Sequence, residues 1–160
     1  MEVPPDEIQV SNGKTMRKTT SAVIDLLGGA RVLGRRVSSE TALVVSLQEG
    51  LPYRALAAVK KRLRLSDREI AEATGIHPRT LIRRKSQQRL RAGESDRLSR
   101  LARVIARTVD VLGSEEDALA WLRHPNRALG GAAPLQYLST DVGAIRVEAI
   151  LSHIEWGDLS

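Results

Sequence analysis

Residues 66–85 of the chain read SDREIAEATGIHPRTLIRRK, and this stretch decides the fold. Ser66 and Glu69 have the spacing of a capping box, in which each side chain accepts a hydrogen bond from the other residue's backbone N–H group. Gly75 follows where a sharp reversal between two helices needs a positive φ angle. Pro78 is tolerated in the first turn of a helix. The stretch is therefore predicted to form two short helices joined by a tight turn.

The spacing inside this stretch is that of a helix-turn-helix unit. A small residue, Ala71, is followed four residues later by Gly75 and six residues after that by an aliphatic, Leu81. The second helix of such a unit lies in the major groove of DNA, with its N-terminal residues facing the base edges. A buried aliphatic is also usual three residues after Leu81, but Arg84 stands there. We therefore expect the second helix to pack somewhat differently, with Ile82 sharing its anchoring.

Basic and hydroxyl side chains follow the predicted turn. Arginine forms bidentate hydrogen bonds with guanine, and the other groups hold phosphates. The alternative is a plain pair of antiparallel helices with a solvated basic face, since a run of charges alone is usually solvated. The turn pattern and the capping box together favour DNA binding. The predicted DNA-binding residues are His77, Arg79, Thr80, Arg83, Arg84 and Lys85, of which Arg79, Thr80, Arg83 and Arg84 are expected to be exposed.

The charges of the chain divide unevenly among three segments. Residues 54–107 carry sixteen basic and five acidic side chains, residues 1–53 carry six of each, and residues 108–160 carry three basic and eight acidic ones. A basic segment favours nucleic acid, whereas an acidic segment suits a different partner. The formal net charge of +6 therefore combines two regions of opposite sign.

The composition and the capping residues predict an all-α protein. The apolar residues are mostly Leu, Ala, Val and Ile, with no Phe, and long strands are hard to find. Helices are expected over 19–27, 39–49 and about 95–112, and a last one from Thr140 to about Glu155. The predicted organisation is a flexible arm (1–14), N-terminal helices that could supply a dimer contact (15–50), a helix-turn-helix DNA-binding domain (51–92), a connecting helix (93–113) and a small helical C-terminal module (114–160).

Several classes of function find no support in the sequence. The chain has no cysteine, its three histidines share no metal-ligand spacing, and its glycine pairs lack the lysine of a P-loop. No spacing predicts a Ser/His/Asp arrangement. No apolar run approaches the roughly 20 residues that cross a bilayer, and the N-terminal residues lack a signal-peptide pattern. We therefore expect a cytoplasmic protein without enzymatic activity, metal or cofactor.

From Trp121 to Gly143 the residues follow the order W-L-x-x-P-N-x-A-L-G-G-x-x-P-L-x-Y-L-x-T-x-x-G. This order resembles the toxin-binding domain of Xre/MbcA/ParS-type antitoxins. The preceding GIHPRTLIRRK resembles the Xre-like helix-turn-helix domain that those proteins carry, and the resemblance covers about residues 50–160. It implies an antitoxin from a bacterial type II toxin–antitoxin pair, with no catalytic activity and no cofactor.

The resemblance also implies partners and a second site. The usual toxin of such a pair has a RES domain, which degrades NAD⁺ or acts as an ADP-ribosyltransferase. The antitoxin covers the toxin's active-site cleft and represses the shared operon by binding operator DNA. Because a single module of this size binds DNA weakly, we expect a homodimer on a two-fold operator, within a hetero-oligomeric complex. A cleft that handles NAD⁺ must attract pyrophosphate, so an acidic module suits it. The predicted toxin-binding residues are Trp121, Asn126, Leu129, Gly130, Thr140, Gly143, Glu155, Trp156, Leu159 and Ser160.

Two alternatives stay open at this point. The chain could be a stand-alone helix-turn-helix regulator whose C-terminal module only oligomerises or binds a small effector. Trp156, near the end of the chain, could fold back over its own small module, or it could enter the toxin cleft together with the acidic tail. Buried aromatic side chains at interface centres are each worth about 2 kcal/mol or more, so the two roles have different consequences.

Overall fold

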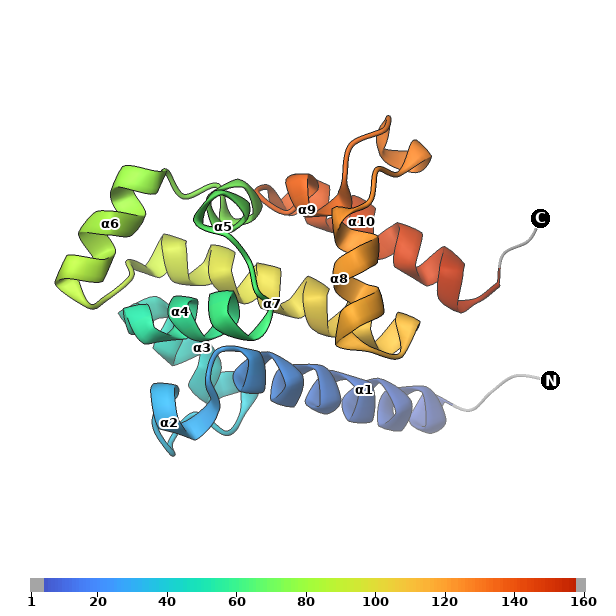
Figure 1. Cartoon of the computed structure of the whole chain (residues 1–160). Helices are drawn as coiled ribbons and strands as arrows, with labels where there is room; N and C mark the ends of the chain where they lie inside the picture. Colours follow the sequence, from blue (N-terminus) through green and yellow to red (C-terminus); the bar gives the residue numbers. More distant parts are fainter. Residues whose placement is uncertain (1–4, 158–160) are drawn as a thin grey trace.

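A computed structural model of the chain describes residues 5–157, with the side chains among them described from Gly13 onward (Figure 1). The described residues form helices and no strand beyond one isolated bridge between Pro52 and Arg89, so the all-α prediction is confirmed. None of the described helices is long and apolar enough to cross a membrane. The elements are α1 (Pro5–Leu26), α2 (Gly29–Leu33), α3 (Glu40–Glu49), α4 (Tyr53–Arg62), α5 (Asp67–Thr74), α6 (Pro78–Gln87), α7 (Ala92–Leu112), α8 (Glu115–Arg123), the 3-10 turn η1 (Arg127–Leu129), α9 (Pro134–Tyr137) and α10 (Asp141–Glu155).

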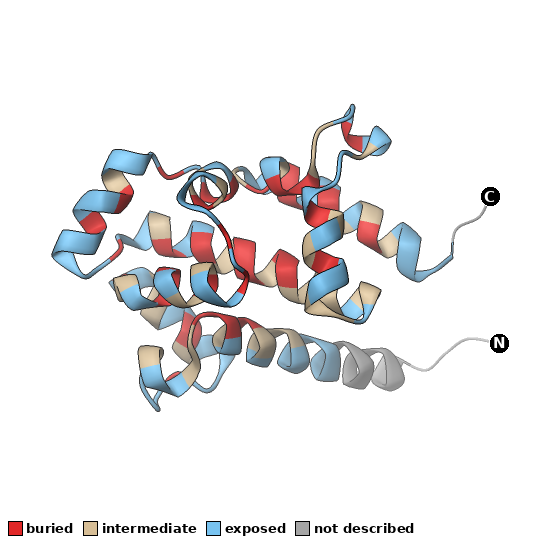
Figure 2. Ribbon diagram, in the orientation of Figure 1, coloured by how far each residue is buried: buried red, intermediate tan, exposed pale blue. Residues whose placement is uncertain are grey.

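The central element is α7, against which α1, α3, α5, α8 and α10 pack (Figure 1). Its stripe of Leu98, Leu101 and Ile105 is fully buried, as the apolar spacing predicts. Figure 2 shows that buried residues gather along α7 and on the faces of the helices that surround it. One hydrophobic core runs from Val23 in α1 to Leu151 in α10, so the helix-turn-helix unit and the C-terminal module share it.

The N-terminal helix is longer than the sequence pattern predicts. Because α1 begins at Pro5, the predicted flexible arm over 1–14 is wrong for residues 5–14, while residues 1–4 lie outside the described part of the chain. The helix predicted over 19–27 is only the C-terminal end of α1, where Val23 and Leu26 are buried. Once that end is packed, each added helical residue costs little, so the helix extends over polar residues that have no apolar period.

The predicted helix limits that depend on capping side chains are confirmed. The Ser66 hydroxyl accepts a hydrogen bond from the Glu69 N–H at 3.1 Å, and the Glu69 carboxylate accepts one from the Ser66 N–H at 2.8 Å. Ser39 caps α3 and Thr140 caps α10 in the same way, through their hydroxyl oxygens. The connecting helix is the exception, since α7 starts at Ala92, three residues before the predicted 95, with Glu94 in its first turn.

Candidate functional site

The helix-turn-helix unit consists of α5 and α6, joined at Gly75, whose φ angle is 65°. His77 is the N-cap of α6, and its Nδ1 accepts a hydrogen bond from the Arg79 N–H at 3.2 Å. This predicted DNA-binding residue therefore fixes the start of α6. Arg79 and Arg83 are exposed on the outer face of α6, as predicted, whereas Thr80 is half-buried. Lys85 is exposed as well, and α6 contains no acidic residue, so its outer face is basic.

Arg84 does not lie on that outer face. Arg84 is only 3% exposed. Its Nε and Nη2 donate hydrogen bonds to the Glu94 carboxylate of α7 at 2.7 and 2.9 Å. Its Nη1 donates to the Gln87 side chain at 2.6 Å. The prediction of Arg84 as an exposed DNA ligand is wrong, because a paired guanidinium fills the position where an aliphatic is usual. The expected anchoring by Ile82 is also wrong, since this residue is 71% exposed.

The Glu94 carboxylate stabilises two helices at once. It accepts a hydrogen bond from the Arg91 N–H at 2.8 Å, which caps the start of α7, while it holds Arg84 of α6. Burial raises the pKa of Glu94, but the hydrogen bonds from Arg84 and the Arg91 backbone lower it more. The pKa of this carboxyl therefore lies below its ordinary value.

The basic surface beside α6 continues onto α7 through residues that sequence reasoning did not single out. A shallow hollow of about 320 Å³ lies between the turn and α7, and Thr80, Arg83, Arg91 and Arg97 are among its lining residues. The Arg97 guanidinium donates to the Gly75 carbonyl oxygen at 3.2 Å, which ties α7 to the turn. The only sequence signal for Arg91 and Arg97 is their place in the basic segment 54–107.

Hydrogen bonds of arginine side chains join the helix-turn-helix unit to the C-terminal module. Arg100 of α7 donates to the carbonyl oxygens of Leu138 and Ser139 at 3.3 and 3.0 Å. Arg123 of α8 donates from Nε to the Glu69 carboxylate of α5 at 2.6 Å. The hydrogen bond from Arg123 holds the pKa of Glu69 below its ordinary value, against the opposite effect of burial. The two parts are therefore fixed relative to one another by side chains as well as by the shared helix α7.

The uneven charge of the sequence partly reflects pairing within the chain. Four of the eight acidic side chains of residues 108–160 bind basic ones from the preceding segments. The acidic module is therefore less negative at its surface than the segment charge predicts. The pairs are Lys18–Asp110, Arg62–Glu115, Arg103–Glu148 and Arg107–Glu155.

Most of the predicted toxin-binding residues inside the motif hold the module together. The Asn126 side chain accepts a hydrogen bond from the Ala128 N–H at 2.9 Å, and Leu129 is buried. Gly130 has a φ angle of 67°, and a Cβ atom on Gly143 would lie 1.9 Å from the Tyr137 carbonyl oxygen. With Thr140 as the N-cap of α10 and Trp121 half-buried against the core, these six residues shape the loop and turn from which α10 emerges.

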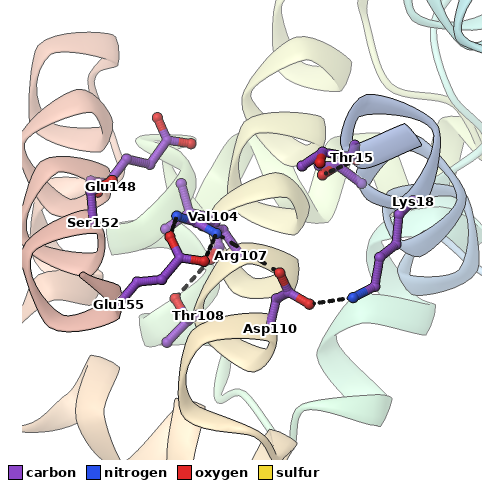
Figure 3. Close-up of polar contacts among 10 residues, drawn as sticks. Thr15, Lys18, Val104, Arg107, Thr108, Asp110, Glu148, Ser152 and Glu155 are labelled. Carbon is purple, nitrogen blue, oxygen red and sulfur yellow. Dashed lines mark hydrogen bonds and ion pairs between the residues drawn. The ribbon is translucent and has the colours of Figure 1, made fainter. Parts of the chain in front are cut away.

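The end of α10 is held by a chain of charged side chains (Figure 3). The Glu155 carboxylate accepts two hydrogen bonds from Arg107 of α7, one of them at 3.1 Å. Arg107 also pairs with Asp110 at 3.8 Å, and Asp110 binds Lys18 of α1 at 2.6 Å. The network links α10, α7 and α1, and Glu155 raises the pKa of Arg107 further above its ordinary value. Glu155, a predicted toxin-binding residue, therefore fixes the last turn of α10.

Trp156 follows this anchored turn directly. It is 81% exposed, so the alternative in which it folds back over its own module is wrong. Val142 and Ile145, earlier on α10, are 79% and 56% exposed. Ala149 and His153 are exposed too. These five positions are spaced three or four residues apart, so they lie on the same face of the helix. Leu159 and Ser160 lie outside the described residues.

These positions form an exposed face of α10, which we call the α10 stripe: Val142, Ile145, Ala149, His153 and Trp156. The opposite face of α10 carries Val147 and Leu151, which are fully buried. Val142, Ile145 and Trp156 make the exposed face of α10 apolar, whereas a helix packed on one side usually carries polar residues on its other side. The α10 stripe is therefore a candidate contact surface.

The fold and these two surfaces define a helix-turn-helix protein with a helical C-terminal module. A family model described as the antitoxin Xre-like helix-turn-helix domain matches residues 42–103. A second, described as the antitoxin Xre/MbcA/ParS C-terminal toxin-binding domain, matches residues 107–157. The chain belongs to this family of Xre/MbcA/ParS antitoxins, which confirms the resemblance found in the sequence.

Two antitoxins support the assignment over most of the chain. The chain is 32% identical over 132 residues to an antitoxin Xre of Yersinia enterocolitica, which covers 81% of this chain and 89% of that protein. It is 33% identical over 132 residues, with the same coverage, to an antitoxin Xre of Photorhabdus laumondii. A chain in the crystal structure of the M. tuberculosis MbcT–MbcA toxin–antitoxin complex is similar at 25% identity and a TM-score of 0.48, covering 66% of this chain and 94% of that one.

Proposed function

We propose that the chain is the antitoxin of a type II pair, which binds and blocks a cognate toxin of the RES type through its C-terminal module. The toxin would degrade NAD⁺ or transfer ADP-ribose, and the antitoxin would act in the cytoplasm without catalytic activity or cofactor. It would also repress its own operon through α6. The observation that carries the proposal is Trp156, exposed at the end of the α10 stripe beside a turn anchored by Glu155 and Arg107.

The α10 stripe has the properties of a binding surface for a folded partner. Its exposed aliphatic side chains and a tryptophan lie on one side of a helix whose other side is packed in the core. Tryptophan is enriched among the residues that dominate binding energy at interfaces. Because the hydrogen bonds between Arg107 and Glu155 already order the last turn of α10, binding a toxin loses little conformational freedom there.

The proposed DNA surface lies at the other end of the molecule. In Figure 1, α6 stands beside the start of α7, whereas α10 ends near the opposite end of that helix. The 21 residues of α7 span about 30 Å at 1.5 Å per residue. One chain therefore has room to hold DNA at α6 and a toxin at the α10 stripe at the same time.

A homodimer is part of the proposal, since single helix-turn-helix units bind operator half-sites in pairs. The N-terminal helices offer exposed apolar side chains for such a contact, namely Met16 on α1 with Val44 and Val45 on α3. The α10 stripe is then left for the toxin, and α6 for the operator. In this arrangement the N-terminal helices contact a second copy of the chain, the α10 stripe contacts the toxin, and α6 contacts the operator.

Two single variants separate the two activities. The chain is co-expressed with the product of the adjacent reading frame, and cell growth and co-elution on a sizing column are measured. Ile145→Asp is expected to lose the toxin and to keep DNA binding, because it places a charge in the α10 stripe. Arg83→Ala is expected to keep the toxin and to weaken DNA binding. If the adjacent product is harmless alone, or elutes separately from the wild-type chain, the antitoxin proposal fails and a stand-alone regulator takes its place.

A further inference from the structure

Ile82 has no role in the packing of its own helix. Of the two large apolar side chains of α6, Leu81 is buried whereas Ile82 is 71% exposed. A β-branched residue lowers helix propensity slightly, so Ile82 does not stabilise α6 either. A single exposed aliphatic side chain is common on protein surfaces, so the place of Ile82 on α6 is what indicates a contact outside the chain.

Polar side chains flank Ile82 on the surface of α6. Arg79 lies three residues before it and Ser86 four residues after it, so both share its side of the helix. Arg83, the next residue, is exposed as well. Ile82 is thus an apolar group within a basic and hydroxyl-bearing face, which is the face that would enter the major groove.

We propose that Ile82 recognises thymine by packing against its C5-methyl group in the major groove. This inference rests on the proposed DNA binding of α6. The edges of the four bases present hydrogen-bonding groups in the major groove, and the thymine methyl is the apolar group among them. Arg79 and Arg83 supply hydrogen bonds to neighbouring bases or phosphates, whereas Ile82 gives the operator a preference for thymine at the position it faces.

The experiment removes that methyl group from the DNA. The region upstream of the chain's own reading frame is amplified with either thymidine or deoxyuridine triphosphate, so that the second fragment lacks every thymine methyl but keeps the base pairs. Affinities of both fragments are measured by fluorescence anisotropy at one salt concentration. We expect the wild-type chain to bind the thymine fragment about fourfold more tightly per contacted methyl, which corresponds to the burial of one methyl group.

Two variants assign this preference to Ile82. Ile82→Ala is expected to lower the ratio of the two affinities by about fourfold, whereas Ile154→Ala, which shortens an exposed isoleucine on α10, keeps the wild-type ratio. Equal affinity of the wild-type chain for both fragments would overturn the inference, and so would an unchanged ratio in Ile82→Ala. The wild-type comparison can overturn the inference even if a variant folds poorly.

The remaining outcomes separate this inference from the function on which it rests. If neither fragment binds the wild-type chain at low salt, DNA binding by α6 fails and the thymine contact fails with it. If both bind tightly and equally, DNA binding stands and only the role of Ile82 is overturned. Loss of toxin binding or a changed oligomeric state in Ile82→Ala, with an unchanged thymine preference, would identify a protein contact instead.

Discussion

Arg84 and Glu94 form a partly buried ion pair through two hydrogen bonds, from Nε to Oε2 at 2.7 Å and from Nη2 to Oε1 at 2.9 Å. The pair joins the helix proposed to read DNA to the first turn of α7, the helix that carries the shared core. The same carboxylate accepts a hydrogen bond from the Arg91 N–H. The Glu94 carboxylate therefore fixes the orientation of α6 relative to α7.

Replacing Arg84 tests whether this pair holds α6. Arg84→Ala is expected to lower the free energy of unfolding by about 1–3 kcal/mol, because it leaves the partly buried Glu94 carboxylate without its guanidinium partner. Thermal or urea unfolding measures the loss. The matched control is Arg83→Ala on the exposed side of α6, which should keep the melting temperature and reduce the salt slope of DNA binding by about one. Equal stability of the two variants would contradict a structural role for Arg84.

Stability is expected to fall in acid because of Glu69 and Glu94. The ordinary pKa of each is 4.5, and both values are lowered in the folded chain, by Arg123 for Glu69 and by Arg84 against burial for Glu94. A carboxyl group whose pKa is lower in the folded chain than in the unfolded chain stabilises the fold at pH values above its ordinary pKa. This stabilisation is lost as the pH falls through the pKa of the folded chain. Urea unfolding between about pH 6 and pH 3 measures the loss. Glu69→Gln should be less stable than the wild-type chain at neutral pH, with the difference shrinking below pH 4.5; a difference that stays constant would contradict the linkage.

The turn before α10 leaves no room for a side chain at Gly143. A Cβ atom there would lie 1.9 Å from the Tyr137 carbonyl oxygen, a backbone atom that cannot move without shifting the turn. Gly143→Ala is therefore expected to lower the free energy of unfolding by about 1–3 kcal/mol. Gly93→Ala is the control, because that position in the first turn of α7 is open, and alanine there should keep or raise stability. Similar melting temperatures for both variants would show that the turn adapts.

Arg107 is expected to act on toxin binding from a distance. Arg107→Met removes both hydrogen bonds to Glu155, so the last turn of α10 should fray and Trp156 should lose its fixed position. Hydrogen exchange of the amides of residues 152–156 is expected to speed up, and toxin affinity to fall by about tenfold, the cost of ordering one or two side chains on binding. Arg103 lies one turn before Arg107 on α7 and pairs with Glu148. Arg103→Met, which breaks that pair, should leave the exchange of residues 152–156 unchanged.

The sequence predicted the features that depend on local chemistry. The capping box at Ser66 and Glu69, the positive φ angle of Gly75 and the cap at Thr140 are set by residues within four positions of one another. Such contacts can be read from spacing, because the hydrogen bonds form within one helical turn. The helix-turn-helix unit was therefore placed from spacing, whereas the motif from Trp121 to Gly143 was placed by its resemblance to the antitoxin family.

Features that depend on distant partners were missed or mistaken. Arginine is a common DNA ligand, so Arg84 was predicted to be one. Only the structure shows that Arg84 is buried and bound to Glu94 of the next helix. The helical residues 5–14 have no apolar period of their own, and the buried end of α1 shows why the helix extends there. The eight acidic residues after residue 107 were predicted to make an acidic surface. Four of them instead pair with basic side chains from earlier segments.

The central claim is that the α10 stripe and the residues after it bind a toxin. Deleting residues 156–160 tests it most directly, because Trp156 is 81% exposed and contributes little to the core. We expect that the truncated chain no longer neutralises the toxin of the adjacent reading frame in co-expressing cells, while its melting temperature and DNA affinity match those of the full chain. Full neutralisation by the truncated chain would contradict the claim, as would a lower melting temperature of the free antitoxin.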